Sequence, residues 1–91
     1  MGIESPIEEL VCDDAKADGW LVRKLKWIGR RNACDRFFAK EGRVVLIEFK
    51  KPGGKARGTQ DKEITALKAA GVECHVIDNP LSAYRILGIK R

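Results

Sequence analysis

Two acidic residues and a lysine, expected on the two strands of one hairpin, are the residues of this sequence best suited to chemistry. Alternate residues of a strand point to the same face, so Glu48 and Lys50 share a face on either side of Phe49. Residues 40–43 carry the only turn signal within this hairpin, and a symmetric turn there pairs residues whose numbers sum to 83. Asp35 then lies directly opposite Glu48, although opposed like charges normally destabilise a strand pair.

A bound divalent cation would explain two opposed carboxylates. Mg²⁺ takes oxygen ligands and is often held by one or two carboxylates together with substrate phosphate. We therefore predict Asp35 and Glu48 as ligands of Mg²⁺ or Mn²⁺, with the backbone carbonyl of Phe49 as a third oxygen. Lys50 would stabilise the charge that grows in the transition state of phosphodiester hydrolysis. The alternative is a surface ion pair between Lys50 and one of the acids, since E-x-K triplets are abundant.

Two further polar residues are candidates for the same site. Glu8 stands near the start of an expected first helix and could supply another ligand, with Glu9 and Glu4 as alternatives. A capping box with Ser5 would also explain Glu8 without any metal. Gln60, one turn into an expected second helix, could orient a water or a phosphate. An ordinary polar residue at a helix N-terminus explains Gln60 equally well.

Basic residues flank the candidate site on expected loops. The net charge of the chain is +5, but residues 1–18 hold six acids and one base, which leaves residues 19–91 with a net charge of +10. This imbalance favours a polyanion partner only slightly. The loop residues could neutralise phosphates on either side of a cleaved bond, and solvated loop charge is the alternative. They are Arg30, Arg31, Lys51, Lys55 and Arg57.

The elements that must position these residues follow from hydrophobic spacing and turn signals. A strand–helix–strand unit near the C-terminus favours a parallel crossover, and the hairpin is apolar on both faces, so it should be covered on both sides. We predict a single α/β domain over residues 1–91, with the order αβββαβα and a mixed sheet flanked by helices. The expected elements are a helix over 5–19, a strand over 20–27, a hairpin over 35–50, a helix over 59–71, a strand over 73–77 and a helix over 79–88.

Several classes of protein are excluded by composition. Cys12, Cys34 and Cys74 form no C-x-x-C pair, which favours reduced thiols in a cytoplasmic setting. His75 is the sole histidine and should point away from Cys74, so a zinc site is not expected. No apolar run approaches the length of about 18 residues that a membrane helix needs.

A series of short motifs runs in order along nearly the whole chain: Gly29-Arg30-Arg31, Asp35-Arg36, Ile47-Glu48-Phe49-Lys50, Pro52-Gly53 and Gln60. Together they resemble the VRR-NUC family of the PD-(D/E)XK nuclease superfamily. The resemblance implies a restriction-endonuclease-like fold and Mg²⁺- or Mn²⁺-dependent cleavage of DNA. By motif, Asp35 and Glu48 match the metal carboxylates, and Lys50 matches the catalytic lysine. Glu8 and Gln60 match the glutamate of the first helix and the glutamine of the following helix. Relatives often have a proline where Cys34 stands.

The same resemblance suggests a substrate. Small stand-alone members of the family resemble Holliday-junction resolvases, tend to be homodimers and are often encoded by phages. We therefore expect a structure-selective endonuclease for branched DNA that acts as a homodimer in the cytoplasm of a bacterial or phage-infected cell. A sequence-specific restriction-type endonuclease and a non-catalytic DNA-binding protein that keeps the fold are the alternatives.

Overall fold

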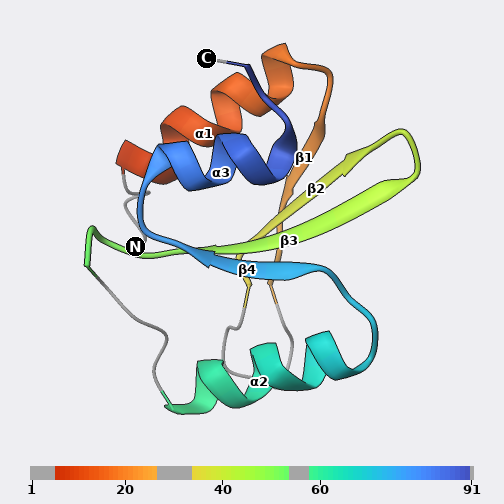
Figure 1. Ribbon diagram of the computed structural model, residues 1–91, viewed down its shortest axis with the longest axis vertical. Coiled ribbons are helices and arrows are strands. Elements are labelled where there is room, and N and C mark those ends of the chain that lie inside the picture. Colours follow the sequence, from red (N-terminus) through yellow and green to blue (C-terminus); the bar gives the residue numbers. More distant parts are fainter. Residues whose placement is uncertain (1–5, 27–33, 54–57, 91) are drawn as a thin grey trace.

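Within the residues that the structure describes, three helices and four strands follow one another in the predicted order. The computed structural model describes residues 6–26, 34–53 and 58–90, with the backbone alone for residues 58–61. None of the helices in these ranges has the length and apolar character needed to span a membrane. The elements are α1 (Pro6–Ala17), β1 (Leu21–Lys24), β2 (Arg36–Lys40), β3 (Arg43–Phe49), α2 (Gly58–Ala69), β4 (Cys74–Ile77) and α3 (Pro80–Leu87) (Figure 1).

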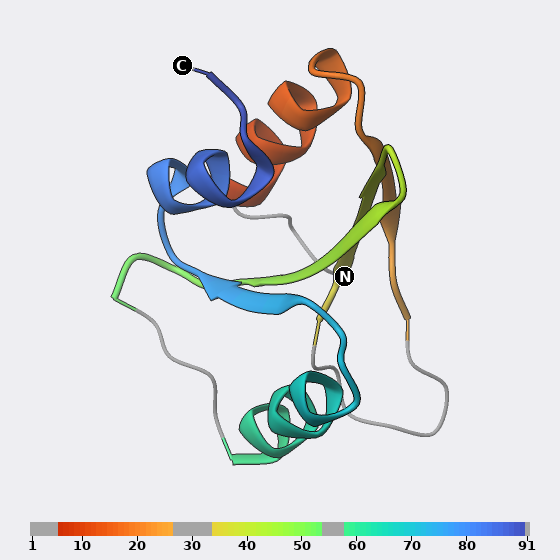
Figure 2. The same cartoon turned by 45° about the vertical axis from the view of Figure 1, so that its right-hand side comes forward.

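The strands form one mixed sheet in the order β1-β2-β3-β4. The pairs β1–β2 and β2–β3 are antiparallel, and β3–β4 is parallel. Helix α2 connects the two parallel strands and lies below the sheet, while α1 and α3 lie side by side above it (Figures 1 and 2). The predicted fold class and the parallel crossover are therefore confirmed.

The register of the β2–β3 hairpin is the predicted one. Arg36 pairs with Ile47, and the ladder continues to Lys40 opposite Arg43, so every pair sums to 83. The turn residues Glu41 and Gly42 both have positive φ, 50° and 83°. Positive φ at both central residues is the mark of a type I′ turn, whose twist matches that of the strands it joins. This turn therefore sets which residues face one another at the far end of the hairpin.

Both faces of β3 are covered, as its apolar character predicts. On the side of α1 and α3, Phe38, Val45 and Ile47 are completely buried. On the side of α2, Leu46 packs with a smaller group of buried side chains. That group comprises Cys34, Ile64 and Cys74. Because β3 is enclosed on both sides, the residues at its C-terminal end are held firmly at the margin of the core.

The first strand is shorter than predicted. It covers Leu21–Lys24 rather than residues 20–27, and residue 27 lies outside the described ranges. Trp20 is only 6% exposed and packs edge-on against Phe38, with 6.4 Å between ring centroids. Beyond Lys24, the Leu25 amide still donates a hydrogen bond of 2.9 Å to the Asp35 carbonyl, so pairing extends one bond past the end of the strand.

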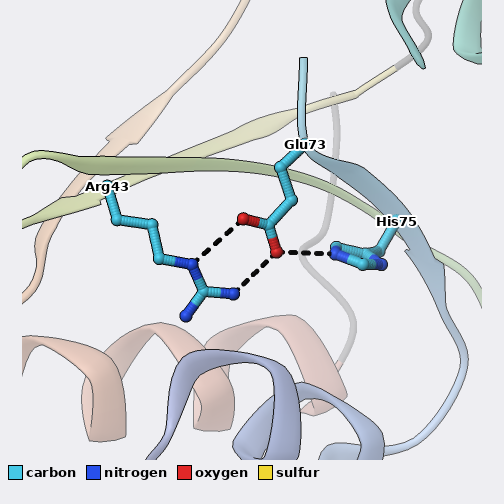
Figure 3. Close-up of polar contacts among 3 residues, drawn as sticks. All are labelled: Arg43, Glu73 and His75. Carbon is cyan, nitrogen blue, oxygen red and sulfur yellow. Dashed lines mark hydrogen bonds and ion pairs between the residues drawn. The ribbon is translucent and has the colours of Figure 1, made fainter. Parts of the chain in front are cut away.

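Two local features fix the C-terminal part. Asn79 Oδ1 accepts a hydrogen bond of 2.8 Å from the Ser82 amide, which makes Asn79 the N-cap of α3. Gly88, with φ 70°, ends this helix as predicted. Glu73 joins the start of β3 to β4 through an ion pair with Arg43 at 2.6 Å and a polar contact with His75 at 3.1 Å (Figure 3).

Candidate metal and phosphodiester site

The predicted site residues gather at the end of the hairpin opposite its turn. Asp35 immediately precedes β2, Glu48 lies near the end of β3, and Lys50 directly follows that strand. Glu48 is 5% exposed, and the Asp35 side chain is half-buried. The hairpin register thus brings residues 13 to 15 positions apart in the sequence to one edge of the core.

Asp35 departs from the regular ladder. Its amide donates a hydrogen bond of 3.2 Å to the carbonyl of Ile47, the residue that also pairs with Arg36. Two consecutive residues of one strand therefore face one residue of the other, which is the arrangement of a β-bulge. The expectation that Asp35 continues the ladder directly opposite Glu48 is thus wrong in detail. Bulges are frequent next to functional sites, where they can redirect a side chain.

The Asp35 carboxyl group lies in a strongly acidic environment. Burial is the main cause that raises its pKa to about 7, and the negative charges of Glu48 and then Glu8 contribute to that rise. Hydrogen bonds from its own backbone and from the backbone of Phe49 oppose these effects. Its Oδ1 atom is buried and has no hydrogen-bond partner within the described part of the chain. A buried oxygen of this kind suits coordination to a cation.

Lys50 places a cation beside Glu48 at this site. Its Nζ lies 3.0 Å from Oε2 of Glu48, and its side chain is 20% exposed. The Glu48 side chain is 6% exposed, so the ion pair lies at the margin of the interior with the ammonium on the solvent side. The Lys50 amide donates to the Ile77 carbonyl at 2.8 Å and so holds the lysine backbone against β4. The predicted proximity of Glu48 and Lys50 is therefore present.

Glu8 reaches the site from α1 and pairs with an arginine that the sequence analysis gave no role. Arg36 Nε donates to Glu8 Oε2 at 2.6 Å, and the side chains are 10% and 8% exposed, respectively. Arg36 directly follows Asp35, so the ion pair ties the first turn of α1 to the start of β2. Arg36 already stood out as part of the Asp35-Arg36 motif, but its pairing with Glu8 could not be predicted because 28 positions separate the two residues. Glu9, the alternative to Glu8, is exposed.

The side chains present fit a hard divalent cation. Two carboxylates at one site, one with a buried oxygen that lacks a partner in the described ranges, match the oxygen ligands that Mg²⁺ and Mn²⁺ use together with water and phosphate. No three His, Cys, Asp or Glu side chains among the described residues form a metal-binding group. The site therefore offers the two-carboxylate set of Asp35 and Glu48, and the carbonyl of Phe49 stays a predicted third ligand.

The remaining predicted residues lie at or beyond the margin of the described ranges. Lys51 is exposed and adjoins the site. The side chain of Gln60 lies outside the described residues, as does Glu4, so their assignments stay predictions. The same holds for four basic loop residues outside those ranges, Arg30, Arg31, Lys55 and Arg57.

Cys34, which stands where relatives often have proline, is fully buried against α2. Burial raises the pKa of its thiol to about 12, and the nearby Cys74, Glu48 and Asp35 act in the same direction. A thiol that stays protonated at neutral pH is a poor nucleophile. Cys34 therefore fills the interior beside the carboxylates and supplies no reactive group.

Comparisons with known proteins identify the fold. No protein-family model matches the sequence, and no curated protein matches it. A solved structure described as a VRR_NUC domain superposes with a TM-score of 0.75 at 24% sequence identity, covering 96% of this chain and 100% of the other. The chain therefore has the fold of that domain over nearly its whole length, and the fold expected from the sequence motifs is confirmed.

Proposed function

We propose that this protein is a divalent-metal-dependent endonuclease that hydrolyses phosphodiester bonds of DNA. The observation that carries the proposal is the meeting of Asp35, Glu48 and Lys50 at one end of the hairpin, with a buried Asp35 oxygen suited to a cation. The fold shared with a VRR_NUC domain supports the same reading. Neither observation would suffice alone, because ion pairs are common and one fold hosts many activities.

Each residue has a distinct proposed part in the reaction. Asp35, Glu48 and the carbonyl of Phe49 would hold Mg²⁺ or Mn²⁺, which when bound lowers the pKa of water and polarises a phosphoryl oxygen. Lys50 would leave its ion pair with Glu48 once the cation neutralises that carboxylate. Its ammonium would then donate hydrogen bonds to the phosphate oxygen on which charge develops. Gln60 would orient the attacking water or the phosphate from α2.

The proposed substrate is branched DNA. The basic loop residues near the site would contact phosphates on either side of the cleaved bond. A two-fold homodimer would carry two active sites, one for each of two strands of a junction. The two active sites would have to lie so that both strands of one junction are cut. These two assignments rest on the resemblance to small VRR-NUC proteins, and they are proposals for this chain.

A panel of labelled DNAs tests the activity. Four-way junction, flap, bubble, single-stranded and linear duplex DNA are incubated with purified protein and Mg²⁺ or Mn²⁺. The expected result is nicking of branched DNA that chelation stops and Glu48→Gln abolishes. Lys16→Gln changes an exposed charge on α1 far along the helix from Glu8 and serves as the matched control.

Other outcomes separate the alternatives. Discrete plasmid fragments cut at defined sites would favour a restriction-type endonuclease over a junction nuclease. Salt-sensitive binding to DNA with no cleavage under either metal would favour the non-catalytic DNA-binding protein. Complete inactivity of the wild-type protein on all five DNAs would count against the proposed function.

A further inference from the structure

Asp78 directly follows β4 and lies beside the turn that leads the chain away from the candidate site. The Gly53 amide donates a hydrogen bond of 3.0 Å to Oδ2 of Asp78, which stands 25 positions later in the sequence. Asn79 Nδ2 donates a second hydrogen bond, of 2.9 Å, to Oδ1. Figures 1 and 2 show the turn after β3 and the link from β4 to α3 side by side. Both carboxylate oxygens of Asp78 therefore make contacts that the proposed reaction does not use.

The turn that Asp78 holds carries two lysines. Lys50 and Lys51 directly precede Pro52 and Gly53. The Lys50 amide is attached to β4 separately, through the Ile77 carbonyl at 2.8 Å. The hydrogen bond from Gly53 to Asp78 attaches the other end of the turn to the same strand end. The exposed Lys51 lies between these two attachment points, so both of them limit where its side chain can reach.

The charge of Asp78 is unfavourable for binding DNA at this place. The hydrogen bond from Asn79 is the main cause, and that from Gly53 the second, that lowers the pKa of the Asp78 carboxyl group below its ordinary value. The group is therefore ionised at neutral pH. A negative charge beside Lys51 repels the phosphates that the basic residues of the site would contact. An acid at this position calls for a compensating role, and its hydrogen bond to Gly53 supplies one.

From this geometry we infer that Asp78 is a positioning residue for DNA binding, whose carboxylate holds the turn after β3 so that Lys51 meets the phosphate backbone. Asp78 acts through Gly53 and touches neither the metal nor the reacting phosphate. It strengthens DNA binding although its own charge opposes it. The inference rests on the proposed function, because it concerns the DNA bound at the same site.

Binding of a labelled four-way junction, measured by fluorescence anisotropy with a chelator present to prevent cleavage, tests the sign of this effect. Asp78→Ala removes both the charge and the hydrogen bond and should weaken binding by about threefold to tenfold, the effect of one hydrogen bond. If the charge alone mattered, the same variant would bind more tightly. Asp13→Ala removes an exposed acid from α1 and is the matched control.

Two further variants separate the charge of Asp78 from its hydrogen bond. Asp78→Asn removes the charge but keeps an oxygen that can accept from the Gly53 amide, so it should bind DNA at least as tightly as the wild type. Asp78→Glu keeps the charge on a longer side chain, which displaces the carboxylate, and should weaken binding. Asn79→Ala weakens α3 but leaves the bond from Gly53 to Asp78, so it should bind like the wild type and serves as the control for stability.

Two other readouts separate positioning from a general loss of structure. Asp78→Ala should raise the KM for cleavage and leave the single-turnover rate at saturating DNA within about twofold, because Lys50 keeps its own attachment to Ile77. Exchange of the Gly53 amide hydrogen with solvent, followed by NMR, should become faster in Asp78→Ala and stay slow in Asp78→Asn.

The outcomes distinguish the inference from the function on which it rests. If Asp78→Ala matches or exceeds the wild type in affinity and KM while the wild-type protein cuts the junction, the inference is overturned and the nuclease proposal stands. A wild-type protein that neither binds the junction nor cuts it with Mg²⁺ or Mn²⁺ would overturn the proposed function and the inference with it. Circular dichroism checks folding. If the alanine variant is unfolded, Asp78→Glu decides, since its charge equals that of the wild type, and an unchanged affinity would overturn the inference.

Discussion

The ammonium group of Lys50 lies 3.0 Å from Oε2 of Glu48, two residues earlier in the chain. This ion pair joins the proposed catalytic cation to a proposed metal ligand. The lysine therefore neutralises the carboxylate in the protein alone, and a divalent cation bound by Glu48 would release it toward the substrate. The two partners should consequently respond differently to mutation.

Replacing Lys50 by methionine should separate catalysis from metal binding. We expect DNA cleavage to fall by about a hundredfold or more, since a group that stabilises transition-state charge is lost. Mn²⁺ affinity should stay equal or increase, because Glu48 loses a competing cation. Single-turnover cleavage rates and calorimetric titrations measure the two quantities, and Lys16→Met is the matched control. Cleavage by Lys50→Met within threefold of the wild-type rate would contradict the proposed role.

Metal binding should depend on pH around neutrality. The Asp35 carboxyl group must be ionised to bind a cation, and burial and the neighbouring acids raise its pKa to about 7. We expect Mn²⁺ affinity to fall by about tenfold for each pH unit below pH 6 and to level off above pH 8, as for a site that releases one proton. Titrations at several pH values measure this. An affinity that does not change between pH 5 and pH 8 would speak against ligation by Asp35.

The same raised pKa predicts a gain of stability on removing the charge. The folded protein holds the Asp35 proton up to about pH 7, whereas the unfolded chain releases it near the ordinary aspartate pKa of 3.8. The unfolded state thus binds fewer protons between these values, and stability declines as the pH rises through that window. With a chelator present, Asp35→Asn should therefore raise the melting temperature at pH 8 and have much less effect at pH 4. Equal shifts at both pH values would contradict this explanation.

The exposed polar contacts of Glu73 predict the opposite pH dependence. Arg43 is the main cause that lowers the pKa of Glu73 to about 2, and His75 acts in the same direction (Figure 3). A depressed carboxyl pKa contributes stability above the unfolded value of 4.5, and this contribution is lost as the pH falls toward 2. Because these side chains are exposed, Glu73→Gln should cost only about 0.5–1 kcal/mol at pH 7. Urea titrations at pH 7 and pH 2 should show that difference shrinking with acidification. Glu9→Gln serves as an exposed carboxylate control.

The N-cap of α3 offers a test of the fold that does not involve the site. Asn79→Ala removes the oxygen that accepts from the Ser82 amide and should destabilise the protein by about 1 kcal/mol. Asn79→Ser keeps a capping oxygen and should recover most of that loss. Urea denaturation measures both changes, and an alanine variant as stable as the serine variant would contradict the assigned cap.

Turn signals, helix caps and hydrophobic spacing in the sequence predict much of the architecture. The turn at residues 40–43 determined the pairing of Arg36 with Ile47, because a two-residue turn with positive φ permits one register. The bounds of α3 were also predictable, since a residue before proline that can cap the helix and Gly88 after the last turn act on their own backbone neighbourhood, but only the structure chose Asn79 over Asp78 as the N-cap. The first strand was predicted too long at both ends, since it begins after Trp20, a core residue, and ends at Lys24.

Part of the candidate site could be predicted from local sequence patterns, and part depended on tertiary packing. Glu48 and Lys50 could be placed together from the amino-acid order, because a strand repeats every two residues and needs no distant partner to do so. Only the tertiary structure showed the bulge at Asp35 and the contact of Glu8 with Arg36. Neither leaves a local pattern, since the bulge depends on how Asp35 meets Ile47 across the hairpin, and the ion pair depends on how α1 packs on the sheet across 28 positions of sequence. Burial in that packed interior also raises the pKa of Asp35, and the extent of burial cannot be predicted from residues adjacent in the sequence.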